Sequence, residues 1–204
     1  NLEQNTEMIE STWSSWAEKI AASRGISVEC LNAMLNNLEP NFPSDFLEKG
    51  LVDELLTREE LQKKLADLYV TDDYKSVKSI SLMDYAKIKD VPNLKASNKV
   101  AVIYADGSIV DGDSSEDVAG DRFAKVIADV RKDEDVKAVV LRVNSPGGSV
   151  LASEKIKAEL DLLSEKVPVI ASYGDYAASG GYWISANTDY IFSNATTLTG
   201  SIGV

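Results

Sequence analysis

At residues 172–183 the chain reads SYGDYAASGGYW, which joins an apolar run at 167–171 to the start of a helix-like run at 180–186. This order is typical of a buried strand that ends in a turn and leads into a helix. Ser179 therefore lies at a strand-to-helix turn, near free backbone N–H groups that can bind an anion. Two interpretations are open for Ser179: a serine that caps the helix, or a serine that takes part in chemistry.

Strand and helix patterns alternate on the N-terminal side of this turn. Apolar runs favour strands, and spaced apolar residues favour helices. The expected order is a strand at 99–105, a helix at 120–132, a strand at 136–143, a helix at 151–164 and a strand at 167–172. This order predicts a parallel sheet with right-handed crossovers, in which ligands bind beyond the carboxyl ends of the strands.

The first seventy residues have mostly helical patterns. Apolar residues recur every three or four positions over 5–23, a shorter helix is expected over 27–36, and Thr57 to Glu60 form a capping box that opens a helix through about Tyr69. The polar stretch that follows contains Pro92 and is only weakly periodic. We therefore expect a helical segment at 1–70, a linker at 71–98 and a partial α/β domain at 99–204.

A second turn, NSPGGS at residues 144–149, follows the apolar run at 136–143. Because consecutive strands lie near one another, this turn and the Ser179 turn are expected to face a common point. Glycine lets the backbone approach a ligand closely, so the amides of Gly148 and Gly180 are candidates for an oxyanion hole. A merely tight connection is the alternative, and the lysine and spacing of a phosphate loop are missing.

The composition restricts the chemistry. The chain has no histidine, which excludes a Ser-His-Asp arrangement within it. A serine nucleophile would then need a neutral lysine, whose pKa burial must lower. The lysines nearest in sequence, Lys155, Lys157 and Lys166, are expected on solvated helix surfaces, which leaves the base unidentified. The net charge of −12 disfavours nucleic-acid binding.

An acidic segment, DGDSSED at residues 111–117, invites comparison with a calcium loop. The comparison fails because Glu116 stands at the position of the turn glycine and Arg122 at that of the bidentate glutamate. We therefore expect a solvated, mobile acidic loop within 106–121, and we predict neither a metal site nor a cofactor. The role of this loop stays open.

Three motifs, NSPGGS at 144–149, AASGGYW at 177–183 and LTGSIGV at 198–204, together closely resemble the signal peptide peptidase A family, also called protease IV. The resemblance is strongest over 99–204. It implies an α/β fold like that of Clp protease and the crotonases, with a spiral of parallel strands and flanking helices. It also implies a Ser-Lys peptidase that degrades cleaved signal peptides in the membrane. Ser179 matches the family's nucleophile, the amides of Gly148 and Gly180 match its oxyanion hole, and Ser201 matches a hydroxyl that positions the lysine.

The segment GLVD at residues 50–53 precedes the serine motif, whereas it follows that motif in single-copy members of the family. This order suggests the long, tandem-repeat form, with the end of one repeat at 1–70 and the start of the next at about 99. The resemblance then puts the lysine outside these residues, so we expect little or no peptidase activity from the chain alone.

The family further implies a homo-oligomer with an N-terminal membrane anchor outside this chain, in the bacterial inner membrane with its catalytic part on the periplasmic side. No apolar run here reaches the about 20 residues that span a bilayer. Two alternatives of other classes remain. One is a crotonase-like acyl-CoA enzyme whose oxyanion hole stabilises an enolate, for which the chain offers no adenine-binding element. The other is a catalytically silent assembly module.

Overall fold

The structure is a computed structural model that describes residues 2–89 and 96–203. Contacts within the chain divide it into two compact units, Asn1–Leu94 and Lys95–Val204. None of the helices in the described residues combines the length and the apolar character needed to cross a membrane. Pro92 of the expected linker and Val204, the last residue of the third motif, lie outside the described residues.

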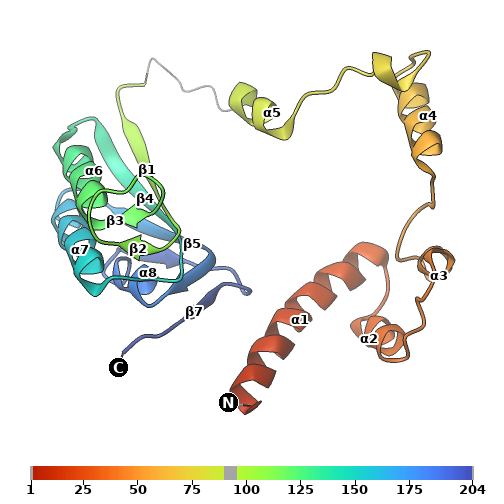
Figure 1. Cartoon of the computed structure of the whole chain (residues 1–204), viewed down its shortest axis with the longest axis horizontal. Helices are drawn as coiled ribbons and strands as arrows, with labels where there is room; N and C mark the ends of the chain where they lie inside the picture. Colours follow the sequence, from red (N-terminus) through yellow and green to blue (C-terminus); the bar gives the residue numbers. More distant parts are fainter. Residues whose placement is uncertain (1, 90–95, 204) are drawn as a thin grey trace. The chain divides into compact units, whose positions relative to one another are not determined.

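The first unit is helical (Figure 1). Its elements are α1 (Leu2–Arg24), α2 (Val28–Asn36), α3 (Pro43–Glu48), α4 (Arg58–Leu68), the 3-10 turn η1 (Tyr74–Ser76) and α5 (Leu82–Lys89). Ser27 caps α2 by accepting a hydrogen bond from the Cys30 amide. Thr57 and Glu60 form the predicted capping box of α4. The range that we expected to be a linker thus contains η1 and α5.

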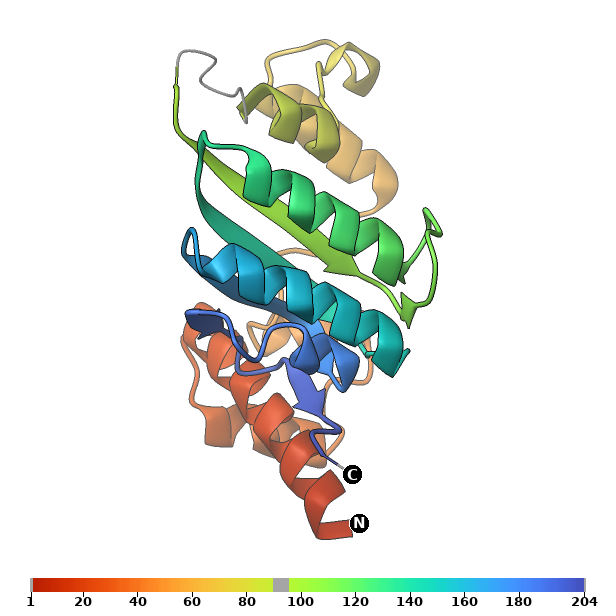
Figure 2. The ribbon, with the colours of Figure 1, turned by 90° about the vertical axis from the view of Figure 1, so that its left-hand side faces the viewer.

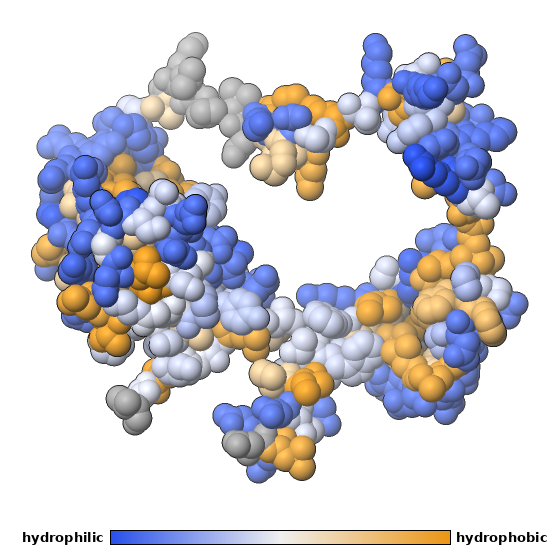
Figure 3. Space-filling view, viewed as in Figure 1, coloured by the Kyte–Doolittle hydropathy of each residue, from blue (hydrophilic) through white to orange (hydrophobic). Residues whose placement is uncertain are grey.

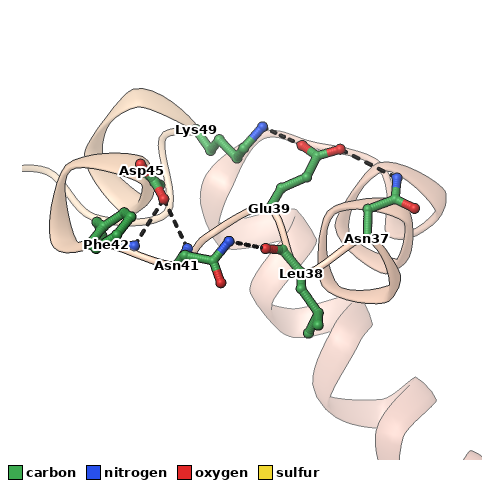
Figure 4. A network of polar contacts seen from close by, with 7 residues as sticks. All are labelled: Asn37, Leu38, Glu39, Asn41, Phe42, Asp45 and Lys49. Atoms are coloured by element: carbon green, nitrogen blue, oxygen red, sulfur yellow. Dashed lines mark hydrogen bonds and ion pairs between the residues drawn. The ribbon is translucent and has the colours of Figure 1, made fainter.

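Side chains hold the connection between α2 and α3 (Figure 4). The carboxylate of Asp45 accepts hydrogen bonds from the amides of Asn41 and Phe42, both at 2.9 Å. These two bonds hold the pKa of Asp45 below its ordinary value, and the bond from the Phe42 amide has the larger effect. Glu39 pairs with Lys49 across the same connection. Figure 3 shows hydrophobic residues gathered around α3, and Phe42, the residue before this helix, is 69% exposed.

The second unit is built on a parallel sheet in the order β1-β4-β5-β6. Its strands are β1 (Lys99–Asp106), β4 (Val136–Ser145), β5 (Val169–Ala178) and β6 (Tyr190–Phe192), and β7 (Leu198–Gly200) also pairs with β5. A separate parallel pair joins β2 (Ile109–Val110) to β3 (Val118–Ala119). The predicted α/β class is confirmed, and the arrangement is consistent with a Clp protease-like fold.

Helices α6 (Gly120–Lys132) and α7 (Val150–Ser164) lie side by side on one face of this sheet (Figures 1 and 2). The strand order advances in one direction, and right-handed crossovers then place every connecting helix on the same face. Alternate residues of β4 point into the core under these helices, where Val139, Leu141 and Val143 are fully buried. On the opposite face, Val100, Val102 and Tyr104 of β1 are exposed.

Two differences from the predicted elements affect the site. The strand expected to end at Ser172 continues to Ala178, because the Asn144 side chain accepts hydrogen bonds from the Asp175 and Tyr176 amides and β7 pairs along the other side. The acidic stretch is more ordered than the mobile loop we expected. It contains β2 and β3, and the Arg122 side chain donates to the carbonyl groups of Ser114 and Asp117.

Candidate active site

Ser179 joins β5 to the short helix α8 (Gly180–Trp183) in an unusual backbone conformation. Its φ of 51° and ψ of −120° lie in a region that residues other than glycine enter only at a cost. The Ser179 amide donates to the Gly200 carbonyl at 2.9 Å, and the Ser179 carbonyl accepts from Trp183 at 2.9 Å. Among the described residues, no amide of α8 donates to Ser179 Oγ, so the interpretation of Ser179 as a side-chain cap is wrong.

The Pro-Gly-Gly turn is held in place by Ile109 of β2. The Ile109 amide donates to the Gly147 carbonyl at 2.9 Å, and the Ile109 carbonyl accepts from Ser149 at 2.8 Å. In such a parallel bridge both bonds go to the neighbours of Gly148, so the N–H of Gly148 points away from Ile109. A Cβ atom added to Gly148 would overlap the Ile109 carbonyl oxygen, so the position requires glycine.

The two turns meet, as their places after neighbouring strands predicted. A Cβ atom built on Gly147 would lie 2.6 Å from the Gly180 nitrogen and 2.7 Å from Ser179 Cβ. One built on Gly180 would lie 3.3 Å from the Gly148 nitrogen. Within the described part of the chain, neither the Gly148 nor the Gly180 amide donates a hydrogen bond. Both donors are therefore available to an anion beside Ser179.

These groups open onto a cavity of about 510 Å³. Strand β7 brings Ser201 to it, because Gly200 pairs with Ala178 and the Thr199 hydroxyl donates to the Ala177 carbonyl at 2.7 Å. The four candidate residues Gly148, Ser179, Gly180 and Ser201 thus share one cavity. Its remaining lining is mostly apolar, as suits an apolar side chain, and consists of Val150, Ser153, Tyr182, Trp183, Ala186, Ile202 and Gly203.

No lysine lines this cavity in the described part of the chain. The Lys155 and Lys157 amines pair with Asp121 and Asp161, each at 2.6 Å, and Lys166 donates to the Arg131 carbonyl. The hydrogen bond to Asp121 is the main cause that raises the pKa of Lys155. A general base needs the opposite shift. The site therefore holds a serine and two amides without a hydrogen-bond acceptor among the described residues, and none of these three lysines reaches it as a proton acceptor.

Sequence reasoning missed two residues of the site. The backbone of Ile109 holds the two neighbours of Gly148, and the only sequence signal for Ile109 was that it and Val110 form an apolar pair in an otherwise polar stretch. Ser153 lies in α7, almost fully buried, and its hydroxyl donates to the Ser149 carbonyl at 2.8 Å beside Gly180. A single serine in the first turn of a helix gives no spacing signal that would mark it.

Comparisons with known proteins find a peptidase family model and several proteases that match this chain. Residues 161–204 match the model of peptidase family S49. Protease 4 of Haemophilus influenzae is 39% identical over 204 residues, which cover 94% of this chain and 33% of that protein. Protease 4 of Salmonella typhi is 38% identical over 99% of this chain and 34% of its own length. The chloroplastic serine protease SPPA of Arabidopsis thaliana is 29% identical over 100% of this chain and 31% of its own length. The chain spans about a third of the length of these relatives.

Proposed function

This chain belongs to peptidase family S49, and on that premise we propose that it is the nucleophile-bearing part of a Ser-Lys serine endopeptidase. One observation carries the proposal. Ser179 is held at positive φ, and its hydroxyl accepts no hydrogen bond from the amides of α8. It lies in the same cavity as two amides that have no acceptor among the described residues. A strained serine at a strand-to-helix turn is the arrangement that presents a nucleophile.

The geometry supports acyl transfer in two steps. Ser179 Oγ attacks the scissile carbonyl carbon, while its proton passes to a lysine amine. The carbonyl oxygen becomes an oxyanion that accepts from the N–H groups of Gly148 and Gly180. Collapse breaks the C–N bond, the protonated base gives its proton to the leaving amine, and water then hydrolyses the acyl-enzyme. The Ser201 hydroxyl, in the same cavity, orients the lysine amine.

The lysine, in this proposal, comes from the protein outside these 204 residues. The pairing of Lys155, Lys157 and Lys166 away from the cavity supports this. We propose the long, tandem-repeat form of the family, in which the preceding repeat supplies the amine. The match to protease 4 over 94% of this chain, helical segment included, agrees with that form.

Cleaved signal peptides are the proposed substrates, and the mostly apolar cavity beside Ser179 supports an apolar peptide. We further propose that the whole protein is a homo-oligomer, anchored in the bacterial inner membrane with its catalytic part on the periplasmic side. The comparisons favour this peptidase over a crotonase-like acyl-CoA enzyme.

The test uses the complete protein and a peptide ester with an apolar acyl side. We expect hydrolysis, and labelling of Ser179 by a fluorophosphonate probe, both abolished by Ser179→Ala. Ser193→Ala, which changes an exposed serine away from the cavity, serves as the matched control and should keep both. Hydrolysis and labelling that survive Ser179→Ala would refute the nucleophile. Acyl-CoA binding without ester hydrolysis would favour the crotonase-like alternative.

A further inference from the structure

Ile109 is in contact with both turns of the site. Its backbone holds the two neighbours of Gly148, with hydrogen bonds of 2.9 Å to the Gly147 carbonyl and 2.8 Å from the Ser149 amide. Its side chain is 2% exposed, and its Cδ1 atom lies 3.1 Å from the place a Cβ atom on Gly180 would occupy. Ile109, which lies outside the three sequence motifs, thus packs beside both Gly148 and Gly180, the two residues whose amides are the proposed oxyanion donors.

We propose that Ile109 and Asp111 are positioning residues that set the distance between the Gly148 and Gly180 amides, an inference that rests on the proposed peptidase function. It assigns a role to the acidic stretch. Neither residue touches the reacting atoms, so neither is a catalytic residue. They act through Gly148, Ser149 and Gly180.

Asp111 acts through the residue that follows Gly148. Ser149 Oγ donates to Asp111 Oδ1 at 2.7 Å and accepts from the Ala152 amide at 3.2 Å at the start of α7. The Ser149 amide meanwhile donates to Ile109. The side chain and the amide of Ser149 are therefore both tied to the segment that begins at β2, which fixes the C-terminal side of Gly148. The Gly147–Gly148 peptide, which carries the Gly148 N–H, is fixed by the hydrogen bond from the Ile109 amide to the Gly147 carbonyl.

The segment 107–119 that carries these two residues is itself anchored at several points. The Gly107 amide donates to the Asn144 carbonyl at 3.1 Å, and the Val118 amide donates to the Ser108 carbonyl at 3.0 Å. Near its middle, the Gly112 carbonyl accepts from the Asp121 amide at 2.9 Å in the first turn of α6. The segment can therefore transmit the positions of β4 and α6 to the Pro-Gly-Gly turn.

An external restraint is needed because two successive glycines have wide conformational freedom. An oxyanion donor contributes to catalysis only if it already points at the developing charge, and small displacements of catalytic groups cost large factors in rate. A turn of the sequence Pro-Gly-Gly does not hold one orientation by itself. The contacts of Ile109 and Asp111 supply the orientation that the glycines lack.

The experiment compares three variants of the complete protein in hydrolysis of the same peptide ester. We expect Asp111→Ala to lower kcat about three- to tenfold, the factor that one hydrogen bond supports, with KM unchanged. Asp111→Asn keeps an acceptor oxygen, so its kcat should stay within twofold of that of the natural enzyme. Asp113→Ala is the matched control, since Asp113 is exposed in the same loop and makes no side-chain hydrogen bond to a described residue. It should change nothing.

Two further measurements separate positioning from folding. Ser149→Ala and Asp111→Ala should be non-additive in kcat, because both remove the same hydrogen bond. Ile109→Val shortens the side chain that faces Gly180. This variant should have a lower kcat even at a temperature well below its thermal unfolding midpoint, where the protein is folded.

Each failure has a distinct meaning. If Asp111→Ala behaves like Asp113→Ala while Ser179-dependent hydrolysis is intact, the positioning role is wrong and the peptidase stands. A change in KM alone would also refute it. If the natural protein shows no Ser179-dependent hydrolysis, the proposed function and this inference fall together.

Discussion

Ser179 occupies a backbone conformation, φ 51° and ψ −120°, that glycine adopts freely and serine does not. Serine at this position therefore lowers the stability of the fold, and the strained conformation places its hydroxyl in the cavity. We predict that the free energy of unfolding of Ser179→Gly exceeds that of Ser179→Ala by about 1 kcal/mol, and that Ser179→Gly therefore unfolds at a higher temperature. This order is the reverse of the usual one, because glycine ordinarily destabilises a folded protein relative to alanine. Both variants should be inactive. Thermal and urea unfolding of the pair measure this, and equal stabilities would mean that the conformation carries no strain.

The two proposed oxyanion glycines differ in what surrounds them. An added Cβ atom on Gly148 overlaps backbone, the Ile109 carbonyl, whereas one on Gly180 lies 2.5 Å from the Ser153 hydroxyl. Gly148→Ala should therefore lower the free energy of unfolding by about 1–3 kcal/mol. No second side-chain substitution should relieve this loss, because the added atom clashes with backbone. Gly180→Ala should be relieved in part by a second change, Ser153→Ala, which removes the clashing oxygen.

The measurement is a double-mutant cycle of unfolding free energies for Gly180 and Ser153, with the Gly148→Ala, Ser153→Ala pair as control. Positive coupling is expected only in the first pair. Coupling of similar size in both pairs would show that Ser153→Ala acts through general loosening of α7.

At the scale of the elements, the capping box of α4 gives a prediction about pH. The Thr57 amide donates to Glu60 at 2.7 Å, and this hydrogen bond is the first cause that lowers the pKa of Glu60 from its ordinary 4.5. A lowered carboxyl pKa stabilises the folded form above the unfolded pKa, and that stabilisation is lost as the pH falls through the folded pKa. The start of α4 should therefore fray on acidification below about pH 4.5.

Hydrogen exchange at the Leu61 amide, which donates to Thr57 at 3.0 Å, reports this fraying. Glu60→Gln keeps an acceptor without a titrating group and should lose this part of the pH dependence. Protection at Leu61 that falls equally in both proteins would assign the effect to other carboxylates.

Long elements were predictable because their patterns repeat. The helix at 120–132 begins and ends where the spacing of its apolar residues indicated, and the capping box placed the start of α4 within one residue. The continuous apolar run of β4 marked a strand that is buried on one face and partly covered on the other. In each case the local pattern agreed with the packing that the tertiary fold required.

Short and non-local features were not predictable in the same way. Strands β2 and β3 have two residues each, too few for any period to show. The extension of β5 depends on Asn144, which is some thirty residues earlier in the chain and accepts from the Asp175 and Tyr176 amides. The positive φ of Ser179 depends equally on distant groups, since its amide donates to Gly200. The sequence motifs gave the candidate residues, and long-range hydrogen bonds set their geometry.

At the scale of the whole molecule, the proposed site lies entirely within the unit Lys95–Val204, and so do the lysines that pair away from it. The proposed nucleophile, the proposed oxyanion donors and the apolar lining of the cavity therefore all come from this unit. In the proposal the base comes from another part of a longer protein. Relatives about three times as long as this chain are consistent with such a division of the site.

The chain of 204 residues should consequently be a folded but nearly inactive peptidase. Without a positioned general base, we expect its kcat/KM for the peptide ester to be about 10²- to 10⁴-fold below that of the complete protein. Circular dichroism and the thermal midpoint establish that it is folded, and Ser179→Ala sets the background rate. Strong hydrolysis that Ser179→Ala abolishes would mean that a lysine of this chain is the base. Replacing Lys155, Lys157 and Lys166 in turn by methionine would then show whether the base is one of these three. Loss of the base should abolish turnover, whereas loss of another of these lysines removes only a surface ion pair or hydrogen bond.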